Sequence, residues 1–135
     1  MMNKDQNNQT KWFLFDAKDK ILGRLCTEIV DTLRGKKETS FIKNIVGGNK
    51  VVVINTDQIK VTGKKEEAKR YYRYSGFHGG LKEKSLGTMR QEDSCRIIFL
   101  AVKGMLPKNK LQEKFLANLK LYKNADHKHN NIKFQ

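Results

Sequence analysis

The sequence predicts an α/β fold, and three observations lead to this prediction. Residues 12–15 and 51–54 are short, continuous apolar runs, which are typical of strands covered on both faces of a sheet. Between them, residues 22–33 repeat apolar side chains at the spacing of one helix face. Two strands joined by a helix are expected to be parallel neighbours, and the right-handed crossover rule places the helix on one face of their sheet.

The elements of the first half follow in order. Asp16 closes the strand at residues 12–15. Gly35 comes after the last turn of the following helix and is suited to the left-handed conformation that closes helices. Residues 36–50 are polar and contain Gly47 and Gly48, after which the second strand runs to Asn55. The apolar face of the helix is formed by Leu22, Leu25, Cys26, Ile29, Val30 and Leu33.

The second half predicts two more helices and a last strand. Asp93 or Ser94 is suited to cap a helix that Pro107, the only proline, would end. Ile97, Leu100 and Ala101 widen its apolar face, so we expect it to be largely buried. Residues 110–119 predict a shorter helix and 119–123 a strand. The apolar positions of the longer helix are Cys95, Ile98, Phe99, Val102, Met105 and Leu106.

Length and composition limit the class of protein. We expect residues 1–10 to be a flexible leader, 11–123 a single α/β domain and 124–135 a basic tail. With 38% apolar residues, the chain has enough for a real core. It has no apolar run near the ~18 residues of a membrane span and no apolar signal region, so we expect a soluble protein without a membrane partner. Cys26 and Cys95 lie inside apolar helical patterns, which favours core thiols in a reducing compartment.

The charge points to a polyanionic partner. The 28 Lys and Arg residues outnumber 14 Asp and Glu, which gives a net charge of +14, and residues 68–135 carry 15 basic and 5 acidic side chains. Residues 71–74 interleave three tyrosines with Arg73, and a glycine-rich loop follows at 75–80. Cations beside rings that can stack on bases predict nucleic-acid binding. The absence of a helix-turn-helix, zinc-finger or zipper pattern favours structured RNA.

The residues predicted to bind RNA lie along most of the chain. A single lysine of this kind is more often simply solvated, and the tyrosines are equally well explained as core β-formers. The set is Arg34, Lys36, Lys37, Lys64, Lys65, Lys69, Arg70, Tyr72, Arg73, His78, Lys82, Lys103, Lys108, Lys110, Lys114, Lys120, His127 and His129.

Catalysis, cofactors and metals find little support in the sequence. His78 is the sole histidine outside the tail, and no serine or cysteine accompanies it in a nucleophile motif. The glycine-rich segment lacks the features of a phosphate-binding loop or a dinucleotide fingerprint. Asp126, His127 and His129 lack a second ligand pair at zinc-site spacing, so a basic tail on RNA is the favoured interpretation. We therefore predict no catalytic residue, cofactor, metal site or small-molecule substrate.

Several segments, taken together, resemble the universal large-subunit ribosomal protein L-thirteen family in its bacterial form. The similarity spans residues 11–129 without long gaps, and its most specific piece is Ala101-Val102-Lys103-Gly104-Met105-Leu106-Pro107. Each motif is weak alone, but their order and spacing make coincidence improbable. The matching segments are Trp12 with residues 16–17, then 22–25, 33–36, 53–55, 61–64, 71–76, 79–82, 101–107, 119–122 and 126–129.

The resemblance implies a three-layer α/β/α fold around a small, mainly parallel four-stranded sheet. It also implies a structural constituent of the large subunit that binds 23S-type rRNA early in assembly, lies near other large-subunit proteins and catalyses nothing. The expected location is the ribosome of the bacterial cytoplasm, with an organellar ribosome as the alternative. The functional alternative is a free RNA-binding regulator or an RNA-processing enzyme, for which only His78 is available.

Two segments depart from the family pattern. Where the family usually has Thr-Pro-His and later Gly-Asp, this chain has Ile42-Lys43-Asn44 and Gly48-Asn49. After Pro107, the usual Gly-Pro-Leu-Gly-Arg is replaced by residues 108–112, Lys-Asn-Lys-Leu-Gln, which keep positive charge and lose a rigid turn. Family contacts in residues 42–49 and 108–112 are therefore not carried over.

Overall fold

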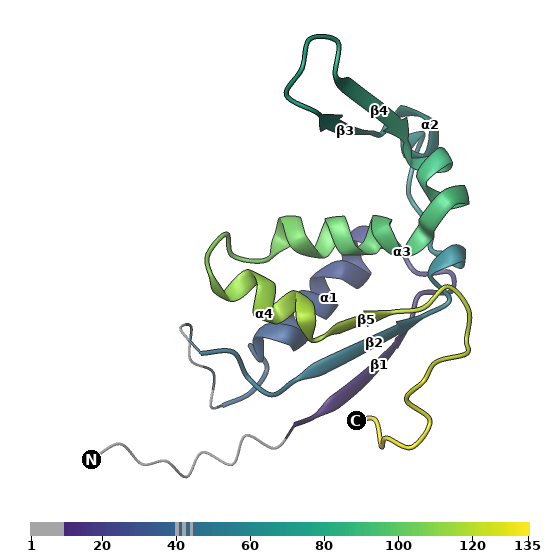
Figure 1. The fold of residues 1–135 in the computed structure, drawn as a ribbon. Coiled ribbons are helices and arrows are strands. Elements are labelled where there is room, and N and C mark those ends of the chain that lie inside the picture. Colours follow the sequence, from purple (N-terminus) through teal and green to yellow (C-terminus); the bar gives the residue numbers. More distant parts are fainter. Residues whose placement is uncertain (1–9, 40, 42, 44) are drawn as a thin grey trace.

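A computed structural model describes residues 10–39, 41, 43 and 45–135 of the chain (Figure 1). The predicted leader, residues 1–10, lies outside the described residues except for Thr10, and so do Ile42 and Asn44 in the first departure from the family pattern. The elements in order are β1 (Trp12–Asp16), α1 (Leu22–Arg34), β2 (Lys50–Ile54), the 3-10 turn η1 (Thr56–Gln58), α2 (Lys65–Ala68), β3 (Arg70–Tyr74), β4 (Leu81–Ser85), α3 (Leu86–Met105), α4 (Leu111–Ala117) and β5 (Leu119–Leu121).

A parallel sheet in the order β1-β2-β5 forms the centre of the molecule. Strands β1 and β2 pair from Trp12↔Lys50 to Asp16↔Ile54, which confirms the predicted strand-helix-strand unit. Strand β5 adds to the other side of β2, with Val51 opposite Leu119. The α/β fold class predicted from the sequence is therefore confirmed.

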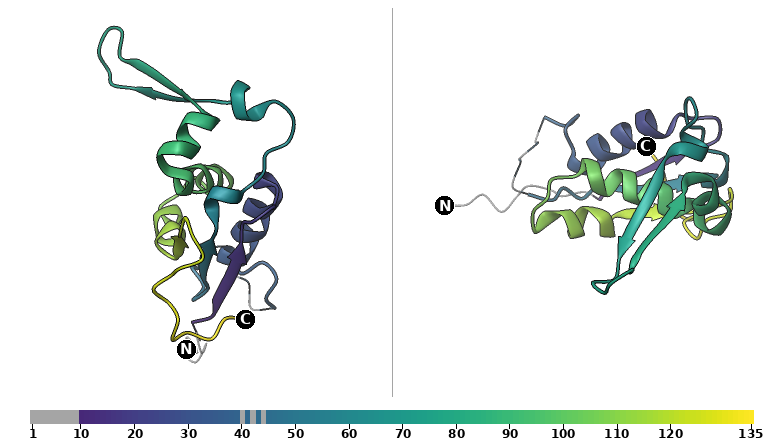
Figure 2. Two further views of the ribbon diagram at one scale, coloured as in Figure 1. Left: turned by 90° about the vertical axis from the view of Figure 1, so that its right-hand side faces the viewer. Right: turned by 90° about the horizontal axis from the view of Figure 1, so that it is seen from above.

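The helices α1, α3 and α4 lie over one face of this sheet (Figures 1 and 2). Both crossovers, from β1 to β2 and from β2 to β5, step in the same direction across the sheet. Right-handed connections in one direction deliver their helices to the same face. Helix α1 consequently packs against α3, and the core forms where both meet the sheet.

The buried faces follow the predicted periodicities. In α1, Leu25, Cys26, Ile29 and Leu33 are buried, and Gly35 closes the helix with a φ of 70°. In β2, Val51 and Val53 face the helices and belong to the hydrophobic core. Val52 is equally buried but points to the opposite face of the sheet, because successive side chains of a strand alternate between its faces.

The C-terminal segment covers part of the opposite face of the sheet. The Gln135 amide donates to the Trp12 carbonyl at 2.9 Å, and the His129 ring centroid lies 5.0 Å from that of Trp12. Leu14 on this face is still 39% exposed. The two faces of the sheet are therefore covered differently. Helices cover one face, and the C-terminal segment covers part of the other.

Two details implied by the family resemblance need correction. Among the described residues the sheet has three strands instead of four, because β3 and β4 pair only with each other in a separate antiparallel hairpin. Helices lie over one sheet face, and the layer on the other face is the C-terminal segment. The physical reason is that β5 lies beside β2 on the side away from β1, so that no right-handed crossover leads to the second face.

Residues 64–85, here called the arm, project away from the rest of the structure (Figure 2). The arm consists of α2, β3 and β4. The body is defined here as the three-stranded sheet with α1, η1, α4, the part of α3 after Asp93 and the segments that connect them. The arm leads directly into α3, because Ser85 ends β4 and also caps α3 by accepting a hydrogen bond from the Thr88 amide at 3.3 Å.

Helix α3 has a kink at Asp93, where φ is −156° and ψ is 95°. The Asp93 carboxylate accepts a hydrogen bond from the Cys95 amide at 3.2 Å. Asp93 therefore caps the second half of α3, as predicted, although the chain is already helical from Leu86. The helix ends at Met105, two residues before Pro107, and α4 and β5 follow close to their predicted positions.

Candidate nucleic-acid interface

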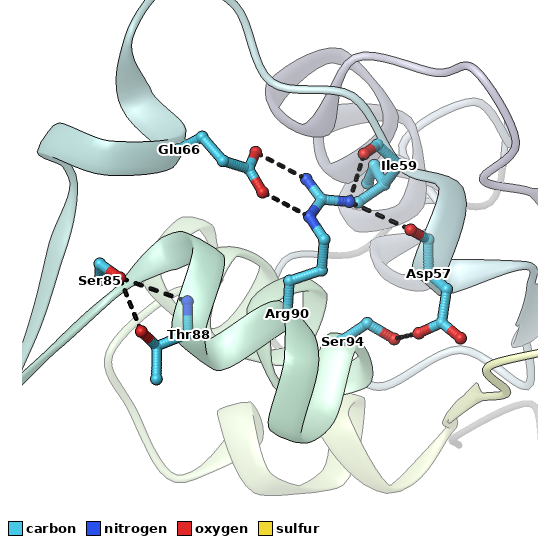
Figure 3. Close-up of polar contacts among 7 residues, drawn as sticks. All are labelled: Asp57, Ile59, Glu66, Ser85, Thr88, Arg90 and Ser94. Carbon is cyan, nitrogen blue, oxygen red and sulfur yellow. Dashed lines mark hydrogen bonds and ion pairs between the residues drawn. The ribbon is translucent and has the colours of Figure 1, made fainter.

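Polar contacts of Arg90 attach the base of the arm to the body (Figure 3). Its guanidinium donates to both carboxylate oxygens of Glu66, at 2.7 and 3.1 Å. It also donates to the backbone carbonyls of Ile59, at 2.6 Å, and Asp57, at 3.2 Å. This bidentate pair is a strong, geometrically specific contact. Arg90 therefore joins α2 and the 56–59 segment to the first half of α3.

The residues around the α3 kink extend this polar network into the body. The Ser94 hydroxyl donates to the Asp57 carboxylate and lies 2.9 Å from the Thr56 hydroxyl. Both Ser94 and Thr56 are completely buried. Buried hydroxyls need such partners, so the network fixes η1 against the kink that carries the arm.

The register of β3 and β4 divides the hairpin into two faces. Residues directly opposite share a face, and successive residues alternate. One face carries the pairs Tyr71↔Lys84 and Arg73↔Lys82. The other carries Arg70↔Ser85, Tyr72↔Glu83 and Tyr74↔Leu81.

The basic face of the hairpin meets the body only at its base. Tyr71 is half-buried, and it packs against the hydrophobic core. Lys69 lies with its Nζ 5.5 Å from the centroid of the Tyr71 ring. Burial raises the pKa of the Tyr71 hydroxyl. Further out, Arg73 and Lys82 are exposed.

The aromatic face of the hairpin is open along its length. Tyr72 is 64% exposed, Tyr74 66% and Leu81 61%, and Phe77 in the loop is 77% exposed. Of the three tyrosines in 71–74, the core interpretation therefore applies to Tyr71 alone. Tyr72 and Tyr74 are surface residues.

Glycines shape the loop at the end of the hairpin. Gly76 and Gly79 have φ values of 89° and 68°, a region that other residues rarely adopt. The Gly80 amide donates to the Phe77 carbonyl at 3.0 Å, which tightens the loop. His78 is exposed in this loop.

The predicted RNA-binding residues occupy four separate regions. The first is the arm, where all eight predicted residues are exposed. The second is the connection between α3 and α4, at the other end of α3 from the arm (Figure 1), where Lys103, Lys108, Lys110 and Lys114 are exposed. There a hollow of about 620 Å³ is lined by Lys103, Lys108, Asn109 and Gln112. The arm residues are Lys64, Lys65, Lys69, Arg70, Tyr72, Arg73, His78 and Lys82.

The third region is the C-terminal end of α1. Lys37 is exposed, whereas Lys36 forms an ion pair with Asp31 at 3.4 Å. Arg34 is half-buried, with its guanidinium carbon 5.9 Å from the Phe41 ring centroid. Two of these three cations therefore already have partners within the protein.

The fourth region is β5 and the C-terminal segment. Lys120 is exposed, but His127 and His129 are half-buried in an aromatic cluster with Trp12, Tyr122 and Phe134. The Tyr122 hydroxyl lies 2.9 Å from His129 Nε2. The two histidines thus hold the tail on the sheet, an internal role that the prediction of RNA contacts did not include.

The two cysteines lie in the environments expected for thiols that are not part of a binding site. Burial raises the pKa of the Cys26 thiol to about 12, as expected for an unreactive core cysteine. Cys95 is half-buried, 3.3 Å from the Thr56 hydroxyl.

Within the described ranges, no group of three or more His, Cys, Asp or Glu residues is arranged to hold a metal ion. None of the described helices has both the length and the apolar composition to cross a bilayer.

Three functional candidates were missed in the sequence. Phe77 and Leu81 are exposed on the arm, and Arg90 fixes its base. An aromatic residue between glycines, in a loop flanked by basic segments, is a signal that could have pointed to Phe77. No comparable signal existed for Leu81 or Arg90, because their roles depend on strand register and on contacts distant in sequence.

Comparison with known proteins identifies the family of the chain. The family model described as "Ribosomal protein L13" matches residues 10–128. The large ribosomal subunit protein uL13 of Lawsonia intracellularis is 47% identical over 126 residues, which are 93% of this chain and 88% of the relative. The uL13 proteins of Syntrophus aciditrophicus and Pseudothermotoga lettingae are 44% and 47% identical, over 93% and 88% of this chain and 89% and 81% of theirs. The chain therefore belongs to the ribosomal protein L13 family of the large ribosomal subunit, whose members are structural proteins and not enzymes.

Proposed function

We propose that the protein binds 23S-type rRNA with the arm and with the lysines between α3 and α4, and that it thereby supports early assembly of the large subunit and translation. The observation that carries this proposal is the position of the exposed cations at the two ends of α3. Cations on separate segments of one folded chain suit a large, folded polyanion better than a small ligand.

The mechanism is electrostatic and needs no chemical step. Phosphates of neighbouring RNA helices repel each other, and cations held at fixed positions between them reduce that repulsion. Release of condensed counterions supplies much of the affinity. The proposed setting is the ribosome of the bacterial cytoplasm, in contact with neighbouring large-subunit proteins; an organellar ribosome is the alternative.

The proposal is tested by sedimentation of the tagged protein from its native cells through a sucrose gradient after a high-salt wash. We expect co-migration with the large subunit. Recovery at the top of the gradient would reject stable membership of the subunit. It would instead favour a free RNA-binding regulator or an RNA-processing enzyme, for which His78→Ala would be the first variant to assay.

The electrostatic mechanism makes a separate prediction about salt. If about six phosphates are engaged, the affinity for protein-free large-subunit rRNA should fall on the order of 10³-fold between about 50 and 200 mM salt. Filter binding over that range measures the slope. An affinity that does not respond to salt would contradict phosphate binding even if the protein sediments with the subunit.

A further inference from the structure

We propose that the two faces of the arm hairpin bind different parts of one RNA. The face with Arg73 and Lys82 binds phosphates, and the face with Tyr72, Tyr74 and Leu81 stacks on unpaired bases. This inference rests on the proposed function and specifies the partner of the arm as RNA with single-stranded bases beside its backbone.

The phosphate assignment follows from a like-charge pair. Arg73 and Lys82 lie directly opposite each other in an antiparallel register, where like charges destabilise a sheet. Neither forms an ion pair with another residue in the described part of the chain. A two-stranded hairpin is marginally stable by itself, so this repulsion opposes its formation. RNA phosphates, one bound at each of the two side chains, would remove the repulsion.

The base assignment follows from the opposite face. Its side chains Tyr72, Tyr74 and Leu81 are each more than 60% exposed, and the loop adds Phe77. Aromatic rings beside cations are the usual surface on which single-stranded bases stack. The tyrosine hydroxyls suit contact with a partner that is polar at its edges.

The Glu83 carboxylate favours bases over phosphates as the partner of this face. Glu83 lies directly opposite Tyr72, and on its own strand it falls between Leu81 and Ser85 on this face. A carboxylate repels phosphate, and it accepts hydrogen bonds from amino groups on base edges. Arg70, at the base of the same face, is placed to bind a phosphate that follows the stacked bases. Unpaired bases therefore fit this face better than a phosphate backbone does.

The test compares two double variants of the full-length protein. The probes are an unstructured RNA strand of about 20 nucleotides and an RNA duplex of about 20 base pairs. We expect Tyr72→Ala with Tyr74→Ala to weaken binding of the single strand at least about 10-fold, change duplex binding less than about 2-fold and leave the salt dependence unchanged. Tyr72→Phe with Tyr74→Phe keeps both rings and should bind like the wild type.

The second double variant removes the cations. Arg73→Ala with Lys82→Ala should weaken binding of both probes and reduce the single-strand salt slope by about 1.4, from about 0.7 for each lost phosphate contact. Lys18→Ala with Lys20→Ala removes the same charge from exposed positions on the body and should leave that slope unchanged. Ile45→Ala, at a residue that is 50% exposed, is the control for loss of an exposed apolar side chain. Thermal unfolding verifies that every variant is folded.

Two outcomes would overturn the inference while leaving the proposed function intact. If the tyrosine-to-alanine variant binds both probes like the wild type and still sediments with the large subunit, the aromatic face has no base partner. If it binds both probes normally but is lost from the subunit, that face meets a neighbouring protein. Wild-type protein at the top of the gradient would instead reject the proposed function itself.

Discussion

The body and the arm are stabilised by different forces. In the body, side chains such as Ile29, Val51 and Ile98 are completely buried. In the arm strands, no residue is buried, and Tyr71 alone packs against the core. A mainly apolar hollow of about 460 Å³, lined by residues of α1, α2 and α3, leaves the packing beneath the arm incomplete.

This difference separates stability from binding. Apolar burial holds the body together, so substitutions there should change the free energy of unfolding. The arm has little burial to lose, and it is held mainly by hydrogen bonds and ion pairs at its base. Substitutions on the arm strands should therefore change RNA binding while leaving stability nearly intact. Each of the following predictions tests this separation.

The largest effect is expected for a cavity in the body. Ile29→Ala removes most of a fully buried side chain from α1 and should lower the free energy of unfolding by about 3–4 kcal/mol. Tyr72→Ala on the arm removes a larger side chain but should change the free energy of unfolding by less than about 0.5 kcal/mol, because Tyr72 is exposed. Urea unfolding measures both. Equal losses would show that the arm folds as part of the body.

The next effect concerns the base of the arm. Arg90→Ala leaves Glu66 and the Ile59 carbonyl without their donor, and we expect a loss of about 1–2 kcal/mol, reduced by the partial exposure of the pair. Amide exchange in β3 and β4 should accelerate more than exchange in β2. Lys84→Ala, which removes the exposed pair with Glu92, is the control and should cost less than about 0.5 kcal/mol. Equal acceleration in β2 would contradict a local role for Arg90.

The same contrast explains how far the sequence predicted the fold. The body elements were predictable because burial leaves an apolar pattern in the sequence, which is a helical repeat in α1 and a continuous run in β2. Strand β4, Leu-Lys-Glu-Lys-Ser, was not predicted, because a strand open on both faces needs no apolar alternation. The helical turns before Asp93 were missed for a related reason, since Asp93 carries a genuine capping signal in the middle of α3.

The candidate site was predictable in its residue types and not in its arrangement. Composition and spacing identified Tyr72 and Arg73 as candidate RNA-binding residues, and Lys82 lies in a segment that resembles the family. Only the strand register shows that Arg73 and Lys82 share a face that excludes Tyr72. His127 and His129 were identified as candidate RNA-binding residues, but the structure packs them inside the protein. Their contacts could not be predicted, because the packing of the tail on Trp12 depends on the whole sheet being formed.

A smaller effect is expected at the tip of the arm. An added Cβ at Gly80 would lie against the Ser75 hydroxyl and 2.8 Å from the Phe77 carbonyl oxygen, so Gly80→Ala must shift the loop. We expect binding to RNA to weaken by about 5-fold, the lower end for the loss of one stacking contact, with thermal stability nearly unchanged. Gly47→Ala, where nothing lies within 4 Å, is the matched control and should change neither quantity. A large drop in thermal stability would mean that the tip contributes to the body.

The smallest effect concerns the packing of the C-terminal segment on the face of the sheet that carries Trp12. Burial, together with His127, Lys120 and Lys50, lowers the pKa of His129 below its ordinary value of 6.5. The unfolded chain therefore binds this proton more readily, so stability should be unaffected above that value and fall as the pH drops through it toward the lower folded pKa. Because the His129 ring lies 5.0 Å from the single tryptophan, Trp12 fluorescence should report the change. The titration should disappear in His129→Gln and persist in His78→Gln, whose site is on the arm; the reverse result would place the pH response in the arm instead of the body.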